Sequence, residues 1–167
     1  LSLPVIRQAG YEADDLIGTL ARKGEVEGLD VVIVTSDKDM FQLLTPKTRI
    51  FDPVKDKWFS EADSQVRFGV EPARVVEIMG LMGDASDNIP GVKGIGEKTA
   101  VKLITQFGTI EELLNRVEEV TPAKTKNLLL EQGEQARMSK QLATIQLDCP
   151  LEFVPAEFQA KAPQTET

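Results

Sequence analysis

Seven carboxylates lie in three short acidic segments, and side chains of this type supply the oxygen ligands that hard divalent cations bind. Asp37 and Asp39 follow a run of β-branched residues, and α/β proteins place their ligands beyond the carboxyl ends of such strands. Taken singly, each segment has an ordinary explanation as a helix cap or a solvated turn. Three of them in one short chain favour a shared site for Mg²⁺ or Mn²⁺. The candidate catalytic and metal-binding residues are Glu12, Asp14, Asp15, Asp37, Asp39, Asp84 and Asp87.

A glycine-rich segment follows the third acidic segment and predicts a phosphate-binding hairpin. Glycines let backbone N–H groups approach a phosphate, and the N-terminus of the following helix favours negative charge. A nucleotide-binding fingerprint requires a preceding strand, whereas residues 75–82 have a helical pattern, so a helix–hairpin–helix is the better interpretation. Carbonyl groups of such a loop can also hold a monovalent cation. The candidate DNA-binding residues are Gly91, Val92, Lys93, Gly94, Ile95, Gly96, Lys98, Thr99 and Lys102.

The composition restricts the chemistry further. The 167 residues include no histidine, which excludes Ser-His-Asp and Cys-His catalysis and the usual zinc sites. The net charge of −8 argues against a nucleic-acid partner, because phosphate binding normally requires a basic excess. Bound divalent cations would reverse the field of the acids, and several lysines are grouped, so the charge does not exclude DNA. The single Cys149 indicates a reducing cytoplasm, and no apolar run reaches the length of a membrane span.

The elements that must position the acids begin with a helix and a strand. Apolar residues within 12–23 have helical spacing, so that Glu12 and Asp15 share one face, whereas Asp14 points elsewhere unless the helix begins later. Residues 29–35 are a continuous β-branched run, which is typical of a strand covered on both faces. A helix followed by a buried strand predicts an α/β architecture with a largely parallel sheet.

The remaining elements are predicted from caps, glycines and prolines. Trp58, Phe59 and Phe107 are assigned to the core, because apolar packing is the commonest use of an aromatic side chain. From Lys98 onward the pattern is wholly helical, and after Pro155 the composition is typical of a linker. The expected strands are 48–51 and 57–59, and the expected helices are 39–44, 60–68, 72–82, 98–107, 109–118, 122–132 and 134–144.

Three segments carry a resemblance to a known family. Tyr11–Asp15, Thr35–Asp39 and Gly83–Gly96 closely resemble, in order and spacing, the 5′-nuclease domains of the flap-endonuclease family, in its bacterial DNA polymerase I subgroup. The resemblance implies a PIN-like α/β core followed by an all-helical part with a helix–three-turn–helix motif. We therefore divide the chain into the C-terminal part of the nuclease core at 1–82, a helical DNA-binding subdomain at 83–154 and a linker at 155–167.

The resemblance also implies a function. Members of this family are metal-dependent 5′-3′ exonucleases or flap endonucleases that hydrolyse phosphodiesters of 5′-flapped or nicked duplex DNA with two metal ions. The segment 91–100 would hold the duplex through its backbone, together with K⁺, and Asp84 would support the ligands rather than bind an ion itself. By resemblance, one ion would be held by Glu12, Asp14 and Asp15, and the other by Asp37, Asp39 and Asp87, with Asp39 bridging the two.

One part of the family pattern has no counterpart in this sequence. The family core begins with a strand that carries a metal-binding Asp, followed by a basic helical arch, so we expect the chain by itself to be inactive or nearly so. We expect a monomeric parent protein in the bacterial cytoplasm, continued by polymerase domains. Two other classes stay open, namely a duplex-DNA-binding module without chemistry and an acidic α/β domain with no nucleic-acid role.

Overall fold

The computed structural model describes residues 4–159, and a small mixed sheet forms the basis of the first half. β1 (Val31–Val34) pairs in parallel with β2 (Thr48–Asp52), and β2 pairs antiparallel with β3 (Lys57–Phe59). A short turn joins β2 to β3, and a connection of that length produces an antiparallel hairpin. The expectation of a largely parallel sheet therefore holds for only one of the two strand pairs.

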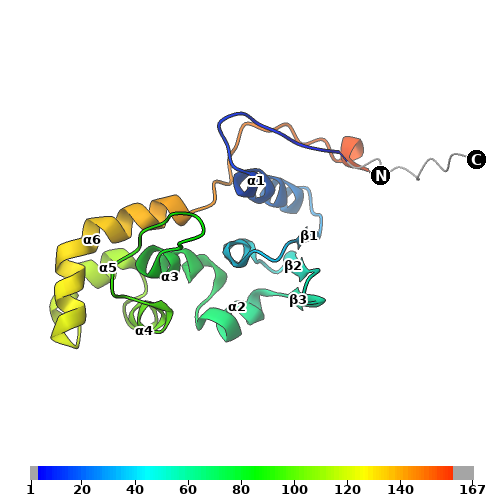
Figure 1. Ribbon diagram of the computed structural model, residues 1–167. Helices are drawn as coiled ribbons and strands as arrows, with labels where there is room; N and C mark the ends of the chain where they lie inside the picture. Colours follow the sequence, from blue (N-terminus) through cyan, green and yellow to red (C-terminus); the bar gives the residue numbers. More distant parts are fainter. Residues whose placement is uncertain (1–3, 160–167) are drawn as a thin grey trace, which may run out of the picture.

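One face of β1 is covered and the other is exposed. α1 (Ala13–Val26) lies beside β1, and Ile33 is buried in the core between them (Figure 1). Val32 and Val34 face the other way and are 42% and 64% exposed. The prediction of a strand covered on both faces is therefore wrong. β-branched residues favour a strand, but they do not reveal how many of its faces are packed.

Four short helical segments accompany the sheet: the first lies between β1 and β2, and the other three connect β3 to the second half. They agree with the predicted elements, and a capping box at Ser60 and Asp63 opens the second of them. α2 ends at Gly69, which adopts the left-handed conformation with φ of 71°. The segments are η1 (Lys38–Leu43), α2 (Glu61–Phe68), η2 (Pro72–Arg74) and α3 (Val75–Met82).

The second half is helical as predicted. Two helices were expected at 122–132 and 134–144, and they form the two parts of α6, which is kinked at Gln132, where φ is −122° and ψ is 18°. The break expected before Gly133 is therefore confirmed, as a kink of one non-helical residue. The elements of this half are α4 (Glu97–Phe107), α5 (Ile110–Asn115), η3 (Val117–Glu119) and α6 (Ala123–Ala143).

α3 is the central helix of this arrangement and packs against both α6 and α4 (Figure 1). Its buried Glu77 accepts a hydrogen bond of 3.0 Å from the backbone N–H of Ile110 and pairs with Lys140 at 2.8 Å. Lys140 also pairs with Glu111 at 2.9 Å. A buried carboxylate with both kinds of partner is well compensated, so this network fixes α5 and α6 onto α3.

The segment after α6 returns along α1 (Figure 1). Gln146 accepts a hydrogen bond from the Thr19 hydroxyl at 3.4 Å, and its own N–H donates to Asp15 Oδ1 at 2.9 Å. The N–H of Ile145 donates to Gln42 Oε1 at 3.1 Å. The end of α6 is thereby joined to α1 and to η1, the elements that carry the first two acidic segments.

Two further expectations concern exposure and the tail. Trp58 was assigned to the core but is 51% exposed, because it lies on the uncovered face of the sheet against Phe51 and under Arg49. Phe107 is buried as predicted.

Pro155–Phe158 forms the short helix η4, and the rest of the predicted linker, from residue 160, lies outside the described residues. None of the helices in residues 4–159 is both long and apolar enough to cross a membrane.

A buried carboxylate at the end of β2 fixes the loop that carries the second acidic segment. Asp52 is 1% exposed and accepts hydrogen bonds from the Ser36 hydroxyl at 2.7 Å and the Val54 N–H at 3.0 Å. Its other oxygen pairs with Lys55 at 2.8 Å. The Lys55 ammonium and the Ser36 hydroxyl hold the pKa of Asp52 well below its usual range, because they stabilise the charged form.

This depressed pKa gives a prediction for stability against pH. Asp52 stabilises the fold fully above its unfolded pKa of about 4, and the contribution is lost as pH falls towards the lower folded pKa. Asp52→Asn should therefore lower the unfolding free energy at pH 7, and the difference from the unsubstituted chain should shrink between pH 5 and pH 3. Urea unfolding at several pH values measures it. Asp56→Asn, on the exposed turn, is the control; an equal loss at every pH for Asp52→Asn would contradict the argument.

Candidate metal centre and nucleic-acid interface

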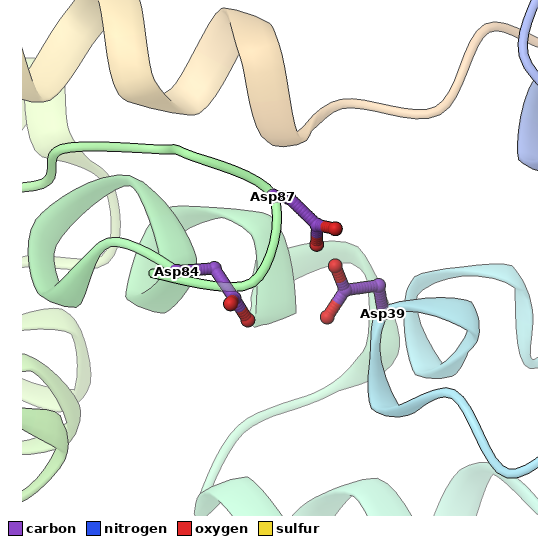
Figure 2. Close-up of side chains that lie close together, drawn as sticks. All are labelled: Asp39, Asp84 and Asp87. Atoms are coloured by element: carbon purple, nitrogen blue, oxygen red, sulfur yellow. The ribbon is translucent and has the colours of Figure 1, made fainter.

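Three carboxylates from two separate elements meet at one point. Asp39 lies in η1, whereas Asp84 and Asp87 lie in the loop after α3, 45 and 48 residues further along the chain. One oxygen of each lies within 4.8 Å of the others. Figure 2 shows Asp39 and Asp87 pointing toward one another across the gap between η1 and the loop. Like charges at this separation repel unless a cation or a proton compensates them.

The loop that carries Asp84 and Asp87 is closed by its own backbone. Asp84 and Ile89 exchange backbone hydrogen bonds of 2.9 and 2.8 Å, and Asp84 Oδ1 accepts from the Ser86 N–H at 2.8 Å. Lys38 bonds to the other Asp84 oxygen and holds the pKa of this carboxyl below its usual range. Asp84 is therefore already compensated by protein groups, whereas the loop presents Asp87 to the solvent.

Asp39 has the opposite environment. It is 8% exposed, and its Oδ1 atom is buried without a hydrogen-bond partner among residues 4–159. Burial, followed by the charge of Asp37, raises the pKa of Asp39 to about 7. A buried, unpartnered carboxylate oxygen is costly, and a divalent cation would supply the missing partner. The oxygen-only donor set, with no histidine in the chain, fits a hard cation.

The first acidic segment borders the same pocket. Glu12, Asp14 and Asp15 line it together with Asp39 and Asp87, so the fold gathers acids from all three segments. Burial and then the nearby Asp37 raise the pKa of Asp14, which places Asp14 among the other acids. Asp14 lies with the other acids, which agrees with a helix that begins after Glu12. The helix begins at Ala13, and Glu12 and Asp15 form a capping box with each other.

Asp37 has a more ordinary position than the sequence suggested. It is exposed, and its Oδ1 accepts a hydrogen bond of 2.9 Å from the Asp39 N–H, as an N-cap of η1 does. It does not line the pocket that the other acids share, although its charge raises the pKa of both Asp14 and Asp39. Its contribution to the pocket is electrostatic.

The pocket also has a wall that sequence reasoning did not identify. Leu142, Ala143, Thr144 and Ile145 line it opposite the acids, and Leu142 is 60% exposed there. These residues lie more than 50 positions after the last acidic segment, and no local pattern marks the end of a helix as part of a site. Lys38, which pairs with Asp84, was also not identified from the sequence. Its position between Asp37 and Asp39 in the Asp-Lys-Asp motif could have indicated it.

The hairpin divides into a buried inner side and an open outer side. Gly91 and Val92 are buried, and their N–H groups donate to Ser139 Oγ at 3.0 Å and to the Leu81 carbonyl at 2.8 Å. The Lys93 N–H donates to Gln132 Oε1 at 2.8 Å. Ile95 is also buried, and Thr99 is half-buried in the first turn of α4.

On the outer side, the N–H groups of Gly94, Gly96, Glu97 and Lys98 have no hydrogen-bond acceptor within the described part of the chain. The side chains of Lys93, Lys98 and Lys102 are exposed around them. Unpaired N–H groups at the start of a helix of 11 residues, next to lysines, can receive a phosphate group.

Comparison with protein families agrees with this geometry. Residues 1–78 match the family model of the 5′-3′ exonuclease N-terminal resolvase-like domain, and residues 70–166 match that of the 5′-3′ exonuclease C-terminal SAM fold. The chain therefore belongs to the 5′-3′ exonuclease family, with a PIN-like core and a helical C-terminal domain, which confirms the predicted fold class.

Individual relatives are DNA polymerases. The chain is 46% identical over 146 residues to DNA polymerase I of Bacillus subtilis, covering 85% of this chain and 17% of that protein. It is 42% identical over 166 residues to the thermostable DNA polymerase I of Thermus filiformis, covering 99% of this chain and 20% of the relative. The chain thus spans a fifth or less of the length of these relatives.

Among solved structures, the chain resembles T5 5′-exonuclease with bound divalent zinc ions, at a TM-score of 0.77 and 25% identity. The match covers 85% of this chain and 53% of the other. A structure of T5 D15 protein co-crystallised with metal ions matches with the same TM-score at 24% identity, which supports the fold.

Proposed function

We propose that this chain is the metal-binding and duplex-binding part of a structure-specific 5′-3′ exonuclease or flap endonuclease. The observation that carries the proposal is the convergence of three acidic segments on one pocket, beside a hairpin whose outer N–H groups find no acceptor among residues 4–159. T5 5′-exonuclease, which shares the fold, has a solved structure with divalent metal ions bound. The substrate class we propose is 5′-flapped or nicked duplex DNA.

The acids have separable roles in this proposal. Asp39 and Asp87 would hold a divalent ion directly, because their oxygens face each other and Asp39 Oδ1 has no partner among residues 4–159. Asp84, which is paired with Lys38, would not bind the ion itself. Glu12, Asp14 and Asp15 line the same pocket and would hold a second ion. When bound, Mg²⁺ or Mn²⁺ would activate a water and stabilise charge on the leaving 3′-oxygen.

The hairpin would fix the duplex relative to these acids. Phosphates would accept hydrogen bonds from the outer N–H groups at Gly94 and Gly96, with Lys93, Lys98 and Lys102 around them. A K⁺ ion between the hairpin carbonyls and a phosphate is part of the proposal. Gly91 lies only four positions after Asp87, so the duplex contact and the acids would be held in a fixed relation.

The broader context is proposed as well. The two relatives described above are DNA polymerases several times longer than this chain, and on that basis we propose that the full-length gene product carries polymerase domains on the same polypeptide. We propose that it acts as a monomer in the bacterial cytoplasm. A full-length gene product without a polymerase domain would contradict the first of these statements.

Cleavage of an end-labelled 5′-flapped duplex by the full-length gene product tests the proposed function. We expect cuts near the flap junction in Mg²⁺, none in EDTA, and little cleavage of blunt duplex of the same sequence. The alternative is a duplex-binding module without chemistry. Salt-sensitive binding of the duplex with no cleavage in Mg²⁺ or Mn²⁺ would favour that alternative and contradict the nuclease.

A further inference from the structure

Three side chains of α6 bind the backbone of the hairpin. Ser139 Oγ accepts from the Gly91 N–H at 3.0 Å, and Gln135 Nε2 donates to the Gly91 carbonyl at 2.6 Å. Gln132 Oε1 accepts from the Lys93 N–H at 2.8 Å. Gln135 and Ser139 are four positions apart and share one face of the helix after the kink, whereas Gln132 lies at the kink itself.

Gln132 makes the most specific of these contacts. Its carboxamide accepts from the N–H of Lys93 and directs its Nε2 at the Lys93 carbonyl at 3.5 Å, so one side chain addresses both polar groups of that residue. Gln132 is also where α6 departs from helical geometry. The bend and the contact coincide, which ties the shape of α6 to the position of the hairpin.

Apolar packing alone does not determine the orientation of this backbone. Val92 and Ile95 are buried and anchor the hairpin, but hydrophobic contacts are non-directional. The peptide groups at Gly91 and Lys93 are oriented by directional hydrogen bonds from α6. Because these peptides bond inward to α6, the next N–H groups, at Gly94 and Gly96, are left for the outer side.

We propose that Gln132 and Gln135 are positioning residues for duplex binding, which hold the hairpin in the conformation that presents its outer N–H groups to a phosphate. The inference rests on the proposed role of the hairpin in binding duplex DNA. Neither residue touches the acidic pocket, so both act on substrate affinity and not on the chemical step.

The test uses the full-length gene product with Gln132→Met, Gln135→Met and the double substitution. Methionine preserves length and removes both polar groups. Gln141→Met, on an exposed position of the same helix, is the matched control. Affinity for a 5′-flapped duplex is measured by fluorescence anisotropy in EDTA, the single-turnover rate at saturating DNA in Mg²⁺, and amide hydrogen exchange of residues 93–98 without DNA.

We expect the double substitution to weaken duplex binding by about tenfold, because the binding-competent conformation of the hairpin would then be only a fraction of the free population, and the apparent affinity falls by that fraction. The single-turnover rate should stay within about twofold of the control, and exchange at 93–98 should become faster. Affinity and exchange equal to those of Gln141→Met would overturn the proposal, as would a loss confined to the rate at saturating DNA. If the unsubstituted protein bound no duplex, both the proposed function and this inference would be contradicted. If it bound duplex but did not cleave it, the affinity comparison would still test the inference.

Discussion

Asp39→Asn and Asp87→Asn are each expected to reduce the single-turnover cleavage of a 5′-flapped duplex by roughly 10³-fold, equivalent to about 4 kcal/mol of activation free energy. Both side chains face the point where the acids converge. An Asn retains the size of the side chain but removes the charge that would hold a divalent ion. The loss should appear in the rate at saturating DNA rather than in DNA affinity.

Stability and binding measurements separate this effect from unfolding. Burial and the charge of Asp37 raise the pKa of Asp39 to about 7, so its charged form is disfavoured in the metal-free fold. A neutral Asn should therefore leave the melting temperature of the metal-free protein unchanged or higher. Duplex affinity should be equal or tighter, because a negative charge near the phosphates is removed.

Asp30→Asn is the matched control, since Asp30 is an exposed acid ahead of β1 and away from the pocket. Its cleavage rate should equal that of the unsubstituted protein. A rate for Asp39→Asn and Asp87→Asn within tenfold of this control would show that the converged acids are not the centre of the chemistry.

Gly91→Ala and Gly96→Ala should have opposite effects, although both lie in the same hairpin. Gly91 has φ of 60°, and a Cβ added there would lie 2.3 Å from the backbone nitrogen of Gly83. The backbones of Gly83 and Gly91 are both held by hydrogen bonds and cannot move apart without breaking them. We therefore expect Gly91→Ala to lower the unfolding free energy by about 3 kcal/mol. Gly96 has φ of −95°, and a Cβ there meets nothing within 4 Å.

Gly96→Ala should therefore leave the unfolding free energy within about 1 kcal/mol, and the smaller entropy of the unfolded chain favours a slight gain. Its methyl group would stand on the outer side, where a phosphate must approach the backbone, so duplex affinity should fall by about tenfold. Urea unfolding and fluorescence anisotropy of both variants measure the two effects. A stable Gly91→Ala, or a Gly96→Ala that binds duplex normally, would contradict the division of the hairpin into inner and outer sides.

Much of the fold follows from local signals in the sequence. The capping box at Ser60, the helix before Phe107 and the hairpin strands around Asp52 appear where caps, glycines and periodicity place them. The exposure of Val34 and Trp58 could not be predicted, because which face of a strand is covered depends on elements that lie far away in the sequence. The kink at Gln132 was predicted as a break between two helices, because Gly133 lowers helix propensity.

The site shows the same division. The acids are recognisable because three acidic segments occur in one short chain without histidine, and the structure gathers six of the seven around one pocket or its adjoining loop. Asp84 pairs with Lys38, whereas one oxygen of Asp39 has no partner within the described part of the chain. Both environments depend on tertiary geometry, so the sequence does not distinguish these two acids. The contacts of Gln132 and Gln135 with the hairpin leave no local signal, because glutamine is common on helices.

The convergence of the acids on a divalent-metal centre is tested most directly by counting Mn²⁺ ions bound to the full-length gene product with electron paramagnetic resonance. We predict saturable binding of Mn²⁺, with at least one ion fewer bound to Asp39→Asn and to Asp87→Asn than to the unsubstituted protein. Asp30→Asn should bind as the unsubstituted protein does. No saturable binding, or binding unchanged by both pocket substitutions, would contradict the metal centre.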